Sequence, residues 1–280
     1  SNNLITDLTP LAGLTALDVL SVSSNQIVSL APLSGLTALT ELVISDNQLA
    51  TLAGIGTLVN LETLYASSNA LTGLDELSGL TALTALYLGN NQIAGLPDLS
   101  ALTALVYLDL RYNLLASTDA LAPLTALNTL DLRGNQLTGV AGLSGLPVLW
   151  TLNLNYNRIT DVTPLSGLTA LQWLGLRDNR LTDAAPLAGL SSLYSLDLRF
   201  NHLVTIAALP GGAVFTAAAS TPNMNIQYNP LLADVCDTQI PALEARGVTV
   251  THDACTGPVY VPDLSGMTRA AAEAAVDAAG

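Results

Sequence analysis

Residues 157–176 read NRITDVTPLSGLTALQWLGL, and the same arrangement of leucines, small residues and asparagine returns every 22 residues along the first two thirds of the chain. The asparagines that mark the copies are Asn3, Asn25, Asn47, Asn69, Asn91, Asn113, Asn135, Asn157, Asn179 and Asn201. A fixed period between about 20 and 50 residues is typical of stacked units, none of which buries its apolar side alone. The sequence therefore predicts a solenoid, and its function is expected on a face that every unit repeats.

Each unit contains a short strand that ends at the asparagine. Before Asn157, Leu152 and Leu154 alternate with polar neighbours, which indicates a strand with one buried face. Copies of this strand should pair side by side as one parallel sheet. We expect each asparagine amide to satisfy backbone groups of its own turn and of the adjacent turn.

The segment that returns the chain to the next strand is too short for a full helix. Residues 32–37, PLSGLT, are representative of it. We predict a 3₁₀ helix or a single turn on the convex side.

These repeats resemble the leucine-rich repeat, LxxLxLxxNxL, and residues 157–176 are similar to the 22-residue internalin type of bacterial surface proteins. The resemblance covers residues 1–205. It implies an α/β solenoid that is mostly β, a right-handed superhelix with one parallel concave sheet and 3₁₀ or short turns on the convex side. It also implies a secreted or cell-surface location. Internalins begin with a helical cap, whereas this chain starts two residues before Asn3, so we expect either a fragment or a second chain that covers the open end.

The period breaks after Asn201. Residues 224–231 still have the pattern of a repeat strand and turn, with six residues inserted near Pro210. Residues 240–246 are helix-like, Gly247 ends that helix and residues 248–252 alternate like a strand. We therefore divide the chain into leucine-rich repeats at 1–205, an irregular last repeat and C-terminal cap at 206–256, and a further segment at 257–280.

The only cysteines, Cys236 and Cys255, bracket the cap. A disulfide across about 20 residues would stabilise this terminal unit by roughly 3 kcal/mol, so we expect them to be paired. Reduced thiols, or a metal site with His252, are the alternatives. Four well-spaced soft ligands are absent from the sequence, which disfavours the metal.

The last segment has a different composition. Residues 261–268, VPDLSGMT, and the alanine-rich stretch after them resemble the opening strand and first helix of a PASTA domain, a bacterial extracellular module linked to peptidoglycan recognition. Only the first third of such a domain is present. The alternative is an alanine-rich terminal helix with no role in binding.

The chain is acidic, with a net charge of −14, no lysine and eight arginines. Nucleic acid is therefore an improbable partner, because it requires a basic stripe on the protein. No run of 18 apolar residues and no signal-peptide pattern occur, so we expect a soluble protein without membrane insertion.

Nothing in the sequence predicts an enzyme. The motifs HExxH and GxSxG and a phosphate-binding glycine loop are all missing, and His202 and His252 lie in a turn and near a terminus. No catalytic residue, cofactor or metal is expected.

Recognition is instead predicted on the concave face. Aromatic residues are expected at outward strand positions: Tyr65, Tyr87, Tyr107, Tyr112, Trp150, Tyr156, Trp173, Tyr194 and Phe200. Aromatic side chains outside a leucine core suggest binding, although they also serve simply to shield a sheet. An Asp-x-Arg spacing recurs at Asp109, Asp131 and Asp197, and Arg111 is also expected near Asp131. The alternative to a binding role is a network of ion pairs in which these charges neutralise one another.

This charge ladder is interrupted at Asn153, Asn155 and Gly175, so Arg177 has no aspartate two residues before it. We predict a shallow pocket there for a carboxylate, an aromatic side chain or a sugar ring. The candidate ligand-binding residues are Tyr107, Arg111, Arg133, Trp150, Asn153, Asn155, Tyr156, Trp173, Gly175, Arg177, Tyr194, Asp197, Arg199 and Phe200.

Three functions compete. The first is binding of a protein ligand through the concave face. The second is binding of a carbohydrate or cell-wall glycan through the aromatic row. The third is structural, a head-to-tail homo-oligomer that uses the uncapped first repeat.

Overall fold

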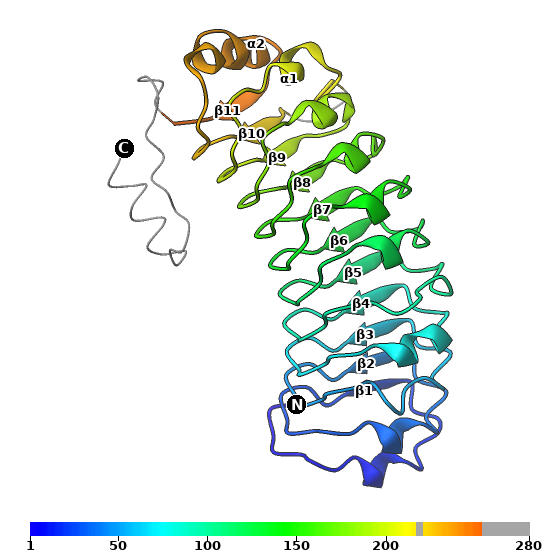
Figure 1. Cartoon of the computed structure of the whole chain (residues 1–280). Coiled ribbons are helices and arrows are strands. Elements are labelled where there is room, and N and C mark those ends of the chain that lie inside the picture. Colours follow the sequence, from blue (N-terminus) through cyan, green and yellow to red (C-terminus); the bar gives the residue numbers. More distant parts are fainter. Residues whose placement is uncertain (217–220, 254–280) are drawn as a thin grey trace.

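The computed structural model of the protein describes residues 1–216 and 221–253. In this part of the chain, eleven strands form one parallel sheet in chain order (Figure 1). The strands are β1 Val19–Ser21, β2 Glu41–Val43, β3 Thr63–Tyr65, β4 Ala85–Tyr87, β5 Tyr107–Asp109, β6 Thr129–Asp131, β7 Thr151–Asn153, β8 Trp173–Gly175, β9 Ser195–Asp197, β10 Asn223–Asn225 and β11 Thr249–Thr251. The predicted solenoid with a single parallel sheet is confirmed.

Short 3₁₀ segments return the chain on the side opposite the sheet. They are η1 Thr9–Leu11, η2 Ala31–Leu33, η3 Asp75–Gly79, η4 Asp119–Leu121, η5 Ala141–Leu143, η6 Thr163–Leu165 and η7 Ala185–Gly189. Several carry proline in the first turn, where no intrahelical N–H is needed. The prediction of 3₁₀ connections is confirmed.

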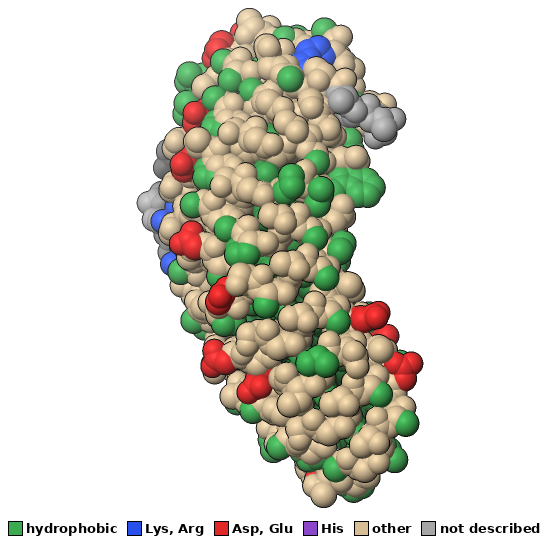
Figure 2. Space-filling model, turned by 90° about the vertical axis from the view of Figure 1, so that its right-hand side faces the viewer, with side chains coloured by type: hydrophobic (Ala, Val, Ile, Leu, Met, Phe, Trp, Pro, Cys, Tyr) green, Lys and Arg blue, Asp and Glu red, His purple; other side chains and the backbone are tan. Residues whose placement is uncertain are grey.

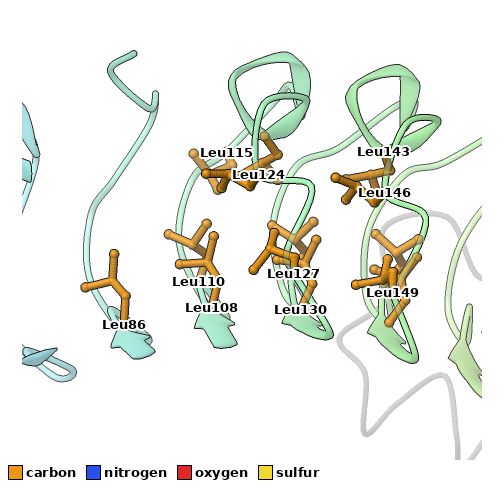
Figure 3. Close-up of a cluster of buried hydrophobic side chains, with 14 of the residues drawn as sticks. Leu86, Leu108, Leu110, Leu115, Leu124, Leu127, Leu130, Leu143, Leu146 and Leu149 are labelled. Atoms are coloured by element: carbon orange, nitrogen blue, oxygen red, sulfur yellow. The ribbon is translucent and has the colours of Figure 1, made fainter. Parts of the chain in front are cut away.

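Leucine fills the space between the sheet and the 3₁₀ segments (Figure 3). Leu108 and Leu130 enter it from strands β5 and β6, whereas Leu124 and Leu146 enter it from the return side. All four side chains are at most 1% exposed. Burying a leucine stabilises a fold by about 1.5–3 kcal/mol, so this continuous leucine core holds successive repeats together.

The repeat asparagine ties each turn to its neighbours. Asn135 donates from Nδ2 to the carbonyl oxygens of Leu132 at 2.9 Å and of Leu110, in the preceding repeat, at 3.0 Å. Its Oδ1 accepts the backbone N–H of Leu115 at 3.0 Å. The predicted double role of the amide is therefore confirmed.

The residue before each of these asparagines has a left-handed backbone. Tyr112 has a φ of 52° and Gly134 a φ of 69°. This conformation disfavours most side chains but costs glycine nothing. The turn at Gly134 therefore forms without the strain that Tyr112 bears.

The C-terminal end follows the predicted order of elements. The inserted residues form α1 Ala208–Gly211, and the cap consists of a π-helical turn η8 Val235–Gln239, helix α2 Ile240–Glu244 and strand β11. Arg246 fastens the cap to the insertion, because its guanidinium donates to the carbonyl oxygens of Leu209, Pro210 and Val214. Cys255 and the PASTA-like residues 257–280 lie outside the described residues.

At the N-terminal end, β1 pairs with β2 alone among the described strands. Leu4 and Val19 are 78% and 50% exposed there. No helix in the described part of the chain has the length and apolar character needed to cross a membrane.

Candidate binding surface

Outward side chains align across the sheet because neighbouring strands pair in register. The third residue of one strand is the partner of the third residue of the next, which produces the row Tyr65, Tyr87, Asp109, Asp131, Asn153, Gly175 and Asp197. This is the row that the 22-residue period predicts. It runs along the concave face from β3 to β9.

Three tyrosines at one end of this surface stack on one another. The rings of Tyr65 and Tyr87 are 4.4 Å apart between centroids and inclined by 14°, and Tyr107 continues the stack 4.6 Å from Tyr87. Their facing sides cover each other. This end of the surface therefore presents ring edges and hydroxyls rather than open ring faces.

Only four of the nine aromatic residues lie in strands: Tyr65, Tyr87, Tyr107 and Trp173. The prediction that all nine occupy outward strand positions is wrong for the other five, because each strand is only three residues long. Tyr112, Tyr156 and Phe200 fall in the left-handed turn position that precedes a repeat asparagine. Trp150 and Tyr194 directly precede β7 and β9. Tyr112, Tyr156 and Phe200 therefore lie beside the C-terminal ends of the strands, which we call the turn edge of the sheet. Trp150 and Tyr194 lie beside the N-terminal ends of the strands, the opposite edge.

The charge ladder is present as predicted. The guanidinium groups pair with the carboxylates two residues before them, at 3.2 Å for Arg111 with Asp109, 3.5 Å for Arg133 with Asp131 and 2.6 Å for Arg199 with Asp197. Each carboxylate also accepts the backbone N–H of its arginine. The aspartates thus fix both the turn and the arginine side chain.

The interruption in the ladder is not a pocket, which corrects the sequence-based prediction. A Cβ placed on Gly175 would lie 2.6 Å from Cη2 of Trp173 and 2.8 Å from the amide atoms of Asn155. These two side chains fill the room that the glycine leaves. Asn155 also replaces the missing aspartate, because its Oδ1 accepts the backbone N–H of Arg177 at 2.8 Å.

Arg177 is not the isolated guanidinium that the sequence suggested. Its Cζ lies 4.8 Å from the ring centroid of Phe200 and 5.5 Å from that of Tyr156. Arg133 lies in the same way over Tyr112, at 5.3 Å. Arginine and aromatic side chains therefore alternate along the turn edge of the sheet, in cation–π geometry.

Burial controls the acid–base behaviour of the ladder. Asp109 faces outward but is only 1% exposed, and desolvation raises the pKa of its carboxyl despite the hydrogen bond and charge of Arg111. Desolvation also raises the pKa of Asp131, which Arg133 and Arg111 offset in part. Exposed Asp161 behaves oppositely, because hydrogen bonds from Thr163 lower its pKa.

One residue of this surface escaped the sequence analysis. Tyr228 stacks on Phe200 with centroids 4.2 Å apart. Phe200 immediately precedes the repeat asparagine Asn201, and Tyr228 precedes the equivalent Asn229. Aligning the copies on the asparagine, across the six-residue insertion, would have revealed the pair.

Charge is distributed unevenly over the molecule. The flank drawn in Figure 2 carries acidic side chains along its whole length and few basic ones. Arg111, the first arginine in the sequence, lies just after β5, so the N-terminal repeats contain no cationic side chain. The arginines of the charge ladder therefore all lie beside strands β5 to β9.

A single parallel sheet, a buried asparagine ladder and 3₁₀ return segments define a leucine-rich repeat solenoid. The family model described as Leucine Rich repeats (2 copies) matches residues 15–57, 59–101, 81–123 and 125–167. These matches span more than half of the chain, which therefore belongs to the leucine-rich repeat family.

Solved structures place it near the internalins. An internalin of Listeria monocytogenes is 25% identical over 91% of this chain and 74% of that chain, with a TM-score of 0.80. Internalin C2 of the same bacterium is 35% identical over 65% of this chain and 78% of that chain, with a TM-score of 0.59. A leucine-rich repeat protein of Leptospira interrogans is 29% identical over 70% of this chain and 52% of that chain, with a TM-score of 0.66. No curated protein matches the sequence.

Proposed function

We propose that the protein is a non-enzymatic extracellular recognition module that binds a protein ligand through the concave face of β5 to β9. The observation that carries this proposal is the alternation of guanidinium groups and aromatic rings along one edge of that face. Arginine, tyrosine and tryptophan are the residues most enriched among the anchors of protein interfaces. The leucine-rich repeat fold is itself typically a scaffold for protein recognition.

The aromatic side chains on both edges are accessible to a partner. Tyr112 on the turn edge is 43% exposed, and Trp150 on the opposite edge is 46% exposed. Tyr112 is held in place by Gly134 and Arg133, which contact its ring. A side chain that is already ordered loses little conformational entropy on binding, so it suits a high-affinity contact.

The extracellular location rests on the resemblance to internalins. A disulfide between Cys236 and Cys255 is part of the same proposal, because such bonds persist in oxidising compartments. The non-enzymatic character rests on the sequence, in which no nucleophile is accompanied by a base.

Affinity capture from a mixture of extracellular proteins, followed by titration of the purified partner, tests the proposal. Trp150→Ala and Arg177→Ala should each weaken binding by about 1–3 kcal/mol, the range for interface anchors. Tyr65→Ala is the matched control. It removes an aromatic side chain from the half of the face that has no arginine and should weaken binding less.

Two results would contradict this assignment. If Tyr65→Ala is as harmful as Trp150→Ala, the site extends over the whole aromatic row rather than β5 to β9. If all three variants bind the purified partner like the wild type, the concave face is not the recognition surface.

A further inference from the structure

The charged ladder encloses an uncharged window on strands β7 and β8. The outward strand positions there are Thr151 and Asn153 on β7 and Trp173 and Gly175 on β8. The neighbouring strands β6 and β9 carry Asp131 and Asp197, each paired with its own arginine. A ligand over the window therefore meets no unneutralised charge from the ladder strands beside it.

Gly175 allows the indole of Trp173 to lie along the strand. The outer edge of the indole, Cη2, reaches over the glycine to a point where any side chain would collide with it. Asn155 packs against the same glycine from the turn side. The indole is half-buried and fixed between the backbone and an amide, so it forms a preformed aromatic platform.

Two amide donors lie beside this platform. Oδ1 of Asn153 accepts the backbone N–H of Asn155 at 3.2 Å, and Oδ1 of Asn155 accepts the backbone N–H of Arg177 at 2.8 Å. These bonds fix which end of each amide is oxygen. Among the described residues, neither Nδ2 group has an acceptor, so both remain available to a ligand.

We propose that Trp173, Gly175, Asn153 and Asn155 form a subsite for a neutral pyranose. The apolar C–H face of the sugar packs on the indole, and its hydroxyl oxygens accept hydrogen bonds from the two amides. An acidic sugar is disfavoured because Arg133 and Arg199, on the strands beside the window, already pair with aspartates, and the guanidinium of Arg177 packs over the rings of Tyr156 and Phe200. This inference rests on the proposed binding role of the concave face, and it identifies the partner as a carrier of neutral sugar.

The platform is tested with the 280-residue chain on a printed array of neutral and uronic- or sialic-acid-bearing oligosaccharides. Wild type should bind neutral members only. Trp173→Ala should lower the affinity about tenfold or more, as expected for loss of an aromatic anchor. Gly175→Ala should have a similar effect, because the added methyl displaces the indole and the Asn155 amide.

Gly175→Ala is also expected to remain folded, since the atoms that its Cβ meets are the ends of side chains rather than backbone. Tyr65→Ala is the matched control, because it removes an aromatic side chain on β3, outside the window, and should bind the array like the wild type. Trp150→Phe leaves Trp173 as the only tryptophan. In this background, a neutral oligosaccharide that binds should change the emission of Trp173 itself. A circular dichroism spectrum identical to that of the wild type separates loss of the platform from loss of the fold.

Binding of acidic members only would overturn the proposal, as would neutral binding that both Trp173→Ala and Gly175→Ala leave intact. Full-strength binding of the captured protein partner after its glycans are removed, with no array member bound, would also overturn it. In that case the concave-face function would stand, since Trp150→Ala and Arg177→Ala would still weaken the protein complex. Failure of those two variants to weaken it would instead refute the function.

Discussion

Asn135 shows how much one side chain contributes to a repeat. Its amide satisfies two carbonyl groups and one N–H that have no access to water in the turn. Asn135→Ala should therefore lower the free energy of unfolding by about 1–3 kcal/mol, the cost of unsatisfied buried polar groups. Gln136→Ala should be nearly neutral, because the Gln136 side chain makes no hydrogen bond within the described residues. Equal shifts of the urea midpoint in the two variants would refute this role.

Asp109 makes a prediction about pH. Its folded pKa is raised by burial, so the folded state binds the proton more tightly than the unfolded state does. Wild type should therefore gain stability relative to Asp109→Asn as the pH falls from about 7 towards about 4. The asparagine is a suitable replacement because Asn153 accepts the same backbone hydrogen bond in β7.

Asp161 supplies the opposite sign for comparison. Its folded pKa is lowered by Thr163, so its contribution is present above the ordinary carboxyl pKa and lost below it. Wild type should lose stability relative to Asp161→Asn as the pH falls from about 5 to about 3. Urea midpoints of the three proteins at several pH values would measure both effects, and two variants with the same sign would disprove the assignment.

At the scale of elements, the period alone was enough to predict the strands, their register and the 3₁₀ returns. Spacing by two residues likewise predicted the pairing of Asp109 with Arg111. The filling of the space over Gly175 was not predictable in this way. It depends on Asn155 reaching across from the preceding repeat. The period places Asn155 beside Arg177, one repeat later, but it does not predict that the Asn155 amide packs against Gly175.

The placement of the aromatic residues failed for a related reason. The prediction assumes that alternation continues beyond the third residue of each strand, but the chain there turns through a left-handed residue such as Tyr156. That turn moves the ring to the edge of the sheet. A periodic pattern thus predicts faces only as far as the extended backbone continues.

The C-terminal cap carries a prediction about its two cysteines. Cys236 packs against the core near α2, and Cys255 lies outside the described residues. We expect the two to be joined, so that intact mass rises by about 2 Da only after reduction, and reduction costs roughly 3 kcal/mol of stability. Alkylation of two thiols in the native protein would contradict the pairing. If the two cysteines are joined, Cys236→Ser should have the same stability as the reduced wild type.

For the whole molecule, the separation of charge decides how salt acts. Residues 1–104 carry eight carboxylates and no arginine, so each carboxylate there is repelled by the others. Removing exposed Glu62 as Glu62→Gln should stabilise the protein by a few tenths of a kcal/mol at low salt. The gain should fade as the Debye length shrinks to about 10 Å in 0.1 M salt.

Asp197→Asn removes the same unit of charge from the other half of the molecule. There the carboxylate receives two hydrogen bonds from the Arg199 guanidinium, at 2.9 and 2.6 Å. This variant should therefore destabilise the protein, by up to about 1 kcal/mol, the upper range for a partly exposed pair. Urea midpoints of both variants at low and high salt compare one charge in two surroundings. Net charge alone predicts that both substitutions stabilise, so a stabilising Asp197→Asn would show that the ladder is weaker than the repulsion across the whole solenoid.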